Sequence, residues 1–450
     1  MDRAIPGMSH GYVTRVHELT ESVVARLLDS VEAARDEIVR RLQQLVRIPS
    51  ETRPPSGDEL AAQRYVEHWF RELGWDVDVF EPWDVPGIKD HPGWWPGLDY
   101  EDRPNVVARC PGTGGGKSLI LNGHIDVVPA GPRELWSVDP YGGEIRNGHL
   151  FGRGAADMKA GIVAMTVALI CVQRSGIRLK GDVTVESVVN EELGGFNGTL
   201  ACCVAGYEAD AAIVTEPTGG DVVVATKGGQ AYRVKITGEA VHHGMWWRGQ
   251  SALDKALILK DGLRDWEQLR TQQFEQGPHE YSESPLPYLA DTVWYLRAGT
   301  PDLMATPADA EFEFWVELMP DEDREEVLHR FEAHLRGFAN HEPYLKMNPP
   351  SIDRMRMRPF TGTQVDSDHE IIRSLIDSGG KVTGRKPERI MGNAANDAMI
   401  FNLYSSTPAV VYGAGSTLTA HAPDEQILIE DVIAMTKCLA LTISDFCGVK

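Results

Sequence analysis

Acidic and histidine side chains recur in this sequence at the points where short apolar segments end. Most of these segments have the length and composition of a buried strand, and the residue that follows is of a type that divalent cations bind. Imidazole and carboxylate groups gathered from separate segments are typical of a metal site that activates water. The set consists of His124, Asp126, Asp157, Glu191, Glu192, Glu216 and His421.

His124 and Asp126 belong to one apolar run, residues 119–128. Side chains two residues apart in a strand point to the same face, so we expect this pair to share a face. A histidine that ligates a metal usually donates its other ring N–H to a carboxylate, and Asp126 stands where the strand end would let it accept that bond. A buried pair that only satisfies its own hydrogen bonds is the alternative.

The middle members of the set also have structural alternatives. Asp157 stands among glycines directly before an apolar helix, a position that suits a helix N-cap as well as a ligand. These glycines match neither a dinucleotide nor a phosphate-loop pattern. Glu191 and Glu192 are adjacent anions at a strand end, which repel each other unless solvent or a cation compensates them. A solvated turn is the alternative for this pair.

Charge counting favours a shared site. In an open α/β sheet, strand ends gather in one crevice. Two divalent cations are balanced by three carboxylates and one bridging hydroxide. With Asp157 as the bridge and one histidine and one glutamate on each ion, every metal has the four ligands that zinc prefers. Glu191 is then left over, and such a site needs a general base.

The elements that must position these residues alternate between strand and helix. Apolar runs over 105–110, 119–128 and 183–189 accompany a helical pattern over 160–174, which predicts an α/β sheet covered on both faces. Apolar residues also recur at helical spacing over 19–46, where one helix and two helices in series both fit.

The pattern of apolar and polar residues changes after Thr218. A strand predicted over 222–225 begins a series of half-exposed strands and amphipathic helices. This pattern indicates a smaller α+β domain inserted into the first. We expect a first catalytic part over 1–222, the insertion over 223–355 and a second catalytic part over 356–450.

The charge and the apolar content of the chain argue against nucleic-acid and membrane partners. Lys and Arg total 44 against 66 Asp and Glu, a net charge of −22, whereas nucleic acids need a cationic surface. No apolar run approaches the ~20 residues of a membrane span, and the first residues lack a signal-peptide core. The 6 cysteines show no CxxC spacing. We therefore expect no nucleic-acid or membrane partner and a cytoplasmic location.

Together these motifs resemble the metallopeptidase family that contains aminoacylase, acetylornithine deacetylase, succinyl-diaminopimelate desuccinylase and carboxypeptidase G. The resemblance implies a zinc-peptidase-like catalytic domain with a central, mostly parallel sheet, and an inserted α+β lid. It extends from about Ile38 to the C-terminus. The matching segments are Gly123–Asp126, Trp136, Asp139–Pro140, Gly152–Gly161, Asn190–Gly195, Thr215–Pro217 and Ala420–Glu425.

The resemblance also implies a role for each metal-binding residue. His124 and Glu216 would hold one metal, and Glu192 and His421 would hold the other. Asp157 would bridge the two ions. Zinc is the metal that these ligands favour, and cobalt and manganese are alternatives.

Catalytic roles follow for three further residues. Asp126 would support His124, and Glu191 would activate the bridging water. The lid of the family pairs with its twin to form a homodimer, and one lid histidine reaches the site of the neighbouring subunit. Spacing back from Gly249 selects His242 over His243 for this role, hydrogen bonding to the oxyanion. A surface histidine pair beside two tryptophans is the alternative.

One position departs from the family pattern. Many members have an arginine about ten residues after a lid proline, where it grips a substrate carboxylate. Counting from Pro307, that position holds Glu317, which cannot clamp an anion. Nothing in the sequence shows that Arg297 or Arg233 substitutes for it. A neutral or cationic amide, such as the formylaminopyrimidines that some relatives deformylate, therefore remains open as substrate.

The sequence thus predicts a two-metal amidohydrolase that cleaves an N-acylated small amine or amino acid, with an acetyl, formyl or similar acyl group. A dipeptidase or carboxypeptidase of the same family is the near alternative. A non-catalytic metal-binding protein on the same fold is the alternative from another class. The sequence alone does not name the acyl group, the amine or the metal.

Overall fold

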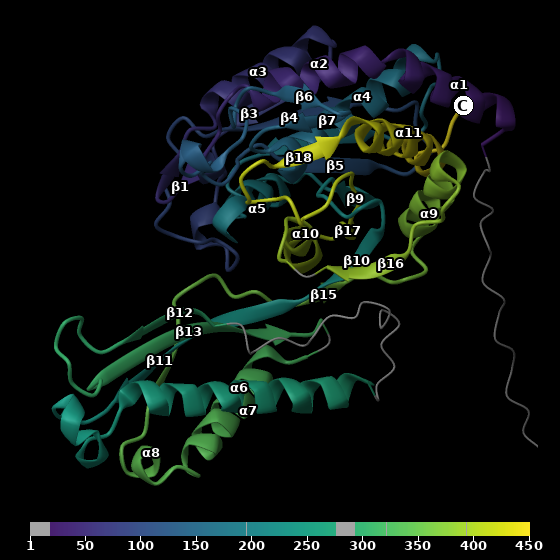
Figure 1. Cartoon of the computed structure of the whole chain (residues 1–450). Coiled ribbons are helices and arrows are strands. Elements are labelled where there is room, and N and C mark those ends of the chain that lie inside the picture. The colour runs from purple at the N-terminus through teal and green to yellow at the C-terminus, as the bar shows by residue number, and fades with distance from the viewer. Residues whose placement is uncertain (1–18, 195, 276–292, 321, 393) are drawn as a thin grey trace, which may run out of the picture.

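The computed structural model describes residues 19–194, 196–275, 293–320, 322–392 and 394–450. The N-terminal segment that we expect to lack a signal-peptide core lies outside these ranges, and so does Gly195 of the matching segments. Within them, one large sheet has the strand order β15-β10-β17-β9-β5-β8-β4-β3, with β16 beside β10 (Figure 1). Its strands are β3 (Asp76–Phe80), β4 (Asn105–Cys110), β5 (Leu119–His124), β8 (Val183–Val188), β9 (Ala211–Val214), β10 (Val222–Thr226), β15 (Thr363–Gln364), β16 (Arg389–Gly392) and β17 (Ala409–Val411).

The centre of this sheet is parallel. β5 lies between β8 and β9 and runs parallel to both, and β17 runs parallel to β9. The pairs β3 with β4 and β10 with β15 are antiparallel. Every residue of β5 is buried, as expected for a strand covered on both faces. The predicted α/β class with a central, mostly parallel sheet is confirmed, and the carboxyl ends of β5, β8 and β9 meet at one edge.

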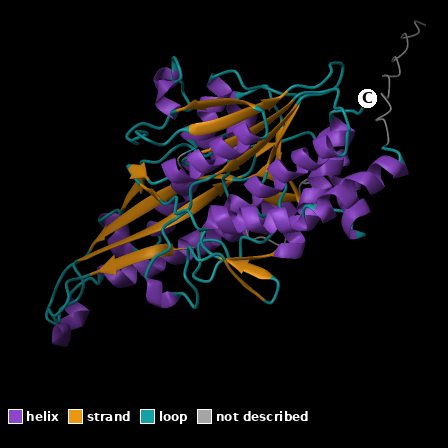
Figure 2. Cartoon of the chain, turned by 90° about the horizontal axis from the view of Figure 1, so that it is seen from above, coloured by secondary structure: helices purple, strands orange, loops and turns teal. Residues whose placement is uncertain are grey.

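Helices cover both faces of the sheet, and Figure 2 shows them gathered along the strands. The run predicted over 19–46 forms two helices that meet at Ala34. One face carries α1 (Glu21–Ala33), α2 (Arg35–Val46), α3 (Leu60–Glu72), α4 (Ala160–Arg174), α9 (Glu370–Thr383) and α11 (Ile429–Phe446). The other face carries α5 (Asn197–Val204) and α10 (Ala398–Tyr404).

The stretch Ala155–Arg174, which contains α4, is long and apolar enough to cross a membrane by length and composition, so the expectation that no apolar run approaches that length was wrong. Inside this protein 94% of its apolar window is buried. α11 packs along α4, and the sheet lies against it on another side. A helix covered on all sides is apolar all round, so its place in the core explains this composition.

A second, smaller sheet lies beyond the large one, with helices on its far side (Figure 1). Its described strands are antiparallel, in the order β12-β13-β11-β14. Burial alternates along β13, where Phe312, Phe314 and Val316 pack toward the helices. The elements are β11 (Gly228–Thr237), β12 (Val293–Ala298), β13 (Asp309–Leu318), β14 (Ser351–Arg354), α6 (Ala252–Glu275), α7 (Arg324–Ala339) and α8 (Pro343–Met347).

One predicted strand lies in the other layer. We expected residues 222–225 to be half-exposed and to open the inserted domain, but β10 is buried throughout and belongs to the large sheet. It pairs with β15, β16 and β17, so an unbroken apolar run suits it better than alternation. The chain crosses to the smaller sheet between Thr226 and Gly228, and it rejoins the large sheet at Thr363.

Two short sheets complete the named strands of the described residues. β1 (Thr52–Arg53) pairs with β2 (Ser56–Gly57) in a tight hairpin. β18 (Gln426–Leu428), β7 (His149–Phe151) and β6 (Glu144–Arg146) form an antiparallel sheet beside the turn that leads into α4. This sheet brings a segment near the C-terminus next to a segment from the first part of the chain.

The approach of α4 to the sheet depends on Gly161. A Cβ at this position would lie 2.2 Å from the carbonyl oxygen of Thr215, too close for any side chain. We expect Gly161→Ala to lower the free energy of unfolding by about 1–3 kcal/mol, because the helix must move off the strand. Denaturant unfolding measures this change.

Gly337 provides the control for this substitution. It lies in α7, is exposed, and has no atom within 4 Å of the position that its Cβ would take. Gly337→Ala should stabilise the protein by roughly 0.5–1 kcal/mol through helix propensity alone. Equal effects of the two substitutions would contradict the close packing of α4.

Candidate metal centre

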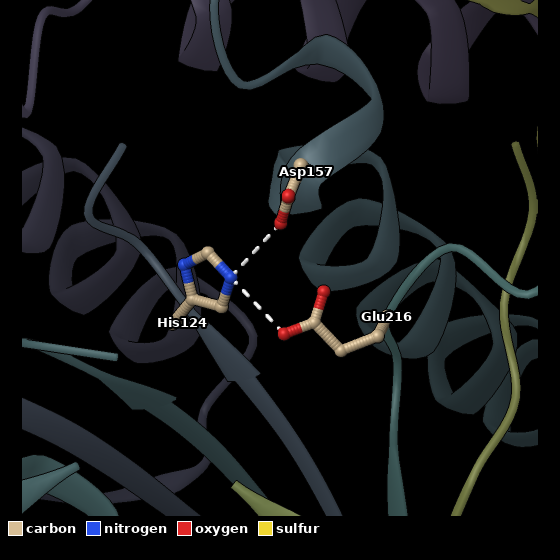
Figure 3. A group of neighbouring side chains, drawn as sticks. All are labelled: His124, Asp157 and Glu216. Atoms are coloured by element: carbon tan, nitrogen blue, oxygen red, sulfur yellow. Dashed lines mark hydrogen bonds and ion pairs between the residues drawn. The ribbon is translucent and has the colours of Figure 1, made fainter. Parts of the chain in front are cut away.

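Residues from separate strands meet at the carboxyl edge of the large sheet. His124 ends β5, Glu191 and Glu192 follow β8, and Glu216 follows β9. Asp157 lies in the turn before α4. Figure 3 shows His124 facing two carboxylates: its Nε2 lies 3.1 Å from Asp157 Oδ1 and 3.2 Å from Glu216 Oε1.

A second group forms around the other oxygen of Asp157. His421 Nε2 lies 3.3 Å from Asp157 Oδ2 and 3.0 Å from Glu192 Oε2. Two groups of three side chains therefore share Asp157, and within each group the potential ligand atoms lie within 4.8 Å of one another. The side chain of His421 is 53% exposed whereas that of His124 is buried, so the second group is the one that opens to solvent.

The donors in these groups fit two divalent cations. Each group offers one imidazole nitrogen and two carboxylates, which zinc, cobalt and manganese all accept as ligands. In the protein alone, an imidazole that contacts two carboxylates must donate a proton to one of them. A bound cation supplies the positive charge itself and leaves the imidazole neutral, the form in which histidine ligates.

The electrostatics of the site also call for positive charge. Burial raises the pKa of Glu216 to about 8, although His124 opposes the shift. Burial also raises the pKa of Glu191 well above its usual range, and the carboxylates of Glu216 and Glu192 add to this. Hydrogen bonds with Asp157 and Glu192 raise the pKa of His421 to about 10. The common cause is a set of anions buried together, which divalent cations would relieve.

Glu191 lies beside both groups without belonging to either. Its Oε2 is 3.9 Å from Nε2 of His124, which is too far for a hydrogen bond. Together with Glu192 and His421, it lines a cavity that opens on the site. A carboxylate that faces this cavity and belongs to neither group is placed to act as a general base.

Asp126 supports His124 in a different way from the predicted one. Nδ1 of His124 donates to the backbone carbonyl oxygen of Asp126 at 2.8 Å, whereas the Asp126 carboxylate is 3.7 Å away. That carboxylate accepts the backbone N–H groups of Glu191 and Glu192, at 3.2 and 3.1 Å. β5 ends at His124, so the strand alternation that placed the two side chains on one face does not reach Asp126.

The turn that carries Asp157 is held by Glu425, to which the sequence analysis gave no role. Its carboxylate accepts a hydrogen bond from Nη1 of Arg153 at 2.6 Å. It also accepts hydrogen bonds from three backbone N–H groups within residues 154–157, at 2.9–3.1 Å. Glu425 lies four residues after His421, just before β18. The sequence offered only a weak signal for it, a carboxylate just before the short strand Gln426–Leu428.

The cavity lies between the site and the smaller sheet, with a volume of about 250 Å³. Lys227, Trp315 and Glu317 line it on one side, and Phe196 and Phe360 line it as well. Nζ of Lys227 donates to Oε2 of Glu317 at 2.9 Å. The position that departs from the family pattern therefore faces the same space as Glu191.

The remaining predicted residues lie away from this cavity in the single chain. His242 is exposed, its Nδ1 accepts the N–H of Gly244 at 3.2 Å, and it is not among the lining residues. Arg233 and Arg297 pair with glutamates of β13 and do not line the cavity either. Neither arginine is therefore positioned to bind a carboxylate inside it.

Comparison with known proteins agrees with this geometry. N-formyl-4-amino-5-aminomethyl-2-methylpyrimidine deformylase of Halalkalibacterium halodurans is 29% identical, over 95% of this chain and 99% of its own. The Bacillus subtilis protein of the same name is 28% identical, over 94% of this chain and 98% of its own.

The fold itself recurs in the crystal structure of human carnosine dipeptidase 1. That structure covers 94% of this chain and 99% of its own, with a TM-score of 0.69 and 16% identity. The model of peptidase family M20/M25/M40 matches residues 120–445, most of the chain. The resemblance inferred from the motifs is thus confirmed, and the chain belongs to peptidase family M20/M25/M40, a family of metal-dependent hydrolases.

Proposed function

We propose that this protein is a two-metal amidohydrolase that removes a formyl or similar small acyl group from an amine without a free carboxylate. The observation that carries the proposal is the pair of ligand groups that share Asp157, with Glu191 beside them at one cavity. Amide hydrolysis agrees with the family, and the two relatives named as deformylases support a formyl group.

The metal assignment follows the two groups. One cation is assigned to His124, Asp157 and Glu216, and the other to Asp157, Glu192 and His421. Divalent cations bound there would supply Lewis-acid polarisation of the amide carbonyl and would lower the pKa of an attacking water. Zinc is the proposed metal because the set combines imidazole nitrogen with carboxylate oxygen in small groups.

The residues of the chain carry the proton transfers. Glu191 takes a proton from the attacking water on its carboxylate and returns it to the nitrogen of the departing amine, which then leaves uncharged. Asp126 holds the backbone of Glu191 in place for both steps. His242 of a second copy would donate a hydrogen bond to the oxyanion of the tetrahedral intermediate.

A dipeptidase or carboxypeptidase is the second candidate, since the fold is shared with human carnosine dipeptidase 1. The cavity favours deacylation over cleavage next to a free carboxyl terminus. Among the described residues that line it there is no arginine, and Glu317, the residue found in place of the family arginine, is one of them. Comparing formyl, acetyl and aminoacyl derivatives of one amine separates the two candidates.

The smaller sheet supports a homodimer. Among the strands that the structure describes, β12 lies at an edge of this sheet, and its Trp294 and Leu296 are 50% and 48% exposed. Trp246 and Trp247, close to His242 in sequence, are 67% and 60% exposed. An open strand edge and exposed aromatic side chains both favour association with another copy. Dimerisation through this sheet would carry His242 toward a neighbouring site.

A cytoplasmic location is part of the proposal. The 6 cysteines are free and buried, and burial raises the pKa of thiols such as Cys438 and Cys110 to about 12. Buried, protonated thiols suit a compartment that keeps cysteine reduced. Fractionation of the cells that produce the protein tests this location.

Metal analysis is the first test of the proposed centre. We expect two equivalents of a divalent transition metal per chain and loss of activity on chelation, with recovery on adding zinc. Chelation should also lower the melting temperature, because a cation at a thousand times its Kd adds about 4 kcal/mol of stability. Metal-free protein that keeps full activity would contradict the proposal.

The role of Glu191 is tested by Glu191→Gln. We expect turnover to fall by about 10²–10⁴-fold, since a general base contributes on that scale, while the metal content stays near normal. Glu186→Gln is the matched control on β8: burial raises the pKa of Glu186 to about 8, so glutamine resembles its protonated form. Activity that survives in Glu191→Gln would remove the base from the mechanism.

A mixed dimer tests His242. Glu191→Gln and His242→Ala should each be nearly inactive alone, whereas coexpressed chains should recover about a quarter of wild-type activity, because half of random dimers are mixed and each holds one complete site. Differently tagged chains allow the mixed dimer to be purified and assayed. No recovery in that species would show that His242 does not act across the interface.

A further inference from the structure

The side of the cavity next to the smaller sheet carries a buried ion pair that the proposed proton transfers do not use. Trp315 and Glu317 are two residues apart on β13 and share the face that points away from the helices. Glu317 accepts a hydrogen bond from Lys227, and the two side chains are only 10% and 5% exposed. The pair therefore offers a hydrogen-bond acceptor and a donor side by side at the cavity.

Aromatic side chains form much of the remaining lining. Phe360 lies between Phe196 and Trp315, with ring centroids 5.8 Å apart in both pairs. The backbone leaves room for these rings: a Cβ at Gly229 would lie 2.2 Å from the Trp315 indole, and one at Gly194 would lie 2.9 Å from Phe360. A flat ring would contact aromatic faces and edges in such a space.

The charges argue against an anionic amine half. A carboxylate bound at this wall would approach Glu317, which the proposed cations do not compensate, and the lysine there is already paired with it. A ring with its own donor and acceptor meets no such repulsion. The donor and the acceptor of such a ring would match the acceptor and the donor of the pair.

We propose, resting on the proposed function, that the cavity recognises a planar nitrogen heteroaromatic amine that carries an amino group next to a ring nitrogen. Glu317 accepts a hydrogen bond from the amino group, and Lys227 donates one to the ring nitrogen. Trp315, Phe196 and Phe360 contact the ring. Glu317 and Lys227 are thus specificity-determining residues, and the acyl group points toward Glu191.

A purely structural role is the competing explanation. Lys227 lies where the chain crosses between the sheets, so its bond to Glu317 on β13 also ties the two layers together. If the pair is only structural, removing Glu317 should lower the stability of the protein, or weaken the binding of every ligand by the same factor. Recognition predicts a loss that depends on the ring of the ligand.

Calorimetric binding of two product amines to metal-loaded protein separates these roles. The probes are 4-amino-5-aminomethyl-2-methylpyrimidine and benzylamine, which share an aromatic ring and an aminomethyl arm but differ in ring donors and acceptors. We expect the wild type to bind the pyrimidine at least about tenfold more tightly, and Glu317→Gln to reduce this preference about 10–100-fold. Lys227→Met should reduce it in the same direction.

Glu313→Gln is the matched control. Glu313 lies on the same face of β13 and accepts a hydrogen bond from Arg233, but it does not line the cavity. The preference for the pyrimidine should be the same in Glu313→Gln as in the wild type. An equal ratio of affinities in the wild type and Glu317→Gln, or no preference in the wild type, would overturn the inference.

Turnover separates this inference from the proposed function. The N-formyl derivatives of both amines are assayed with the same proteins. Hydrolysis of neither derivative by metal-loaded wild type overturns the proposed deformylation, whatever the affinities show. Hydrolysis of both with equal preference in the wild type and Glu317→Gln overturns the recognition role alone.

Discussion

The site depends on burying four carboxylates at one edge of a sheet. Asp157, Glu191, Glu192 and Glu216 lie around only two imidazoles. Removing a single anion from water without a partner is costly, and anions placed together repel as well. The raised pKa of Glu216 and the shifted pKa of His421 are the response of the protein alone. Two divalent cations would also compensate the negative charge of the four carboxylates. Metal binding would therefore stabilise this edge of the sheet as well as form the reactive centre.

The large sheet carries the metal centre, and the smaller sheet lines the cavity beside it. The strands that end at the metal centre are buried and parallel, so their ends are fixed by the core of the large layer. The smaller sheet turns its helix-free face toward the cavity and contributes Trp315 and Glu317 from one strand. Changes on that strand can alter which amine is bound while the reacting groups stay in place, since the two sets lie on different elements.

Much of this arrangement could be predicted, because it rests on local patterns. Short apolar runs that end in His or Glu indicate strand ends, and parallel strands bring such ends together. The contacts that support the site residues, and the pairing of one strand, could not be predicted. Asp126 turns its carboxylate to two backbone N–H groups because the strand stops at His124, which no periodicity reveals. β10 joined the large sheet through pairing with strands that come more than a hundred residues later.

Glu425 shows why such contacts matter to the chemistry. Asp157 is common to both ligand groups, so any displacement of its turn would disturb both at once. A side chain held only by its own rotamer would move too freely for this role. Here the backbone of the turn donates three hydrogen bonds to one carboxylate, and Arg153 balances its charge at 2.6 Å. These four donors satisfy the Glu425 carboxylate, which offsets part of the cost of burying its charge. The same carboxylate lies four residues after His421, so one short segment carries both a proposed ligand and the group that holds the turn of the shared ligand.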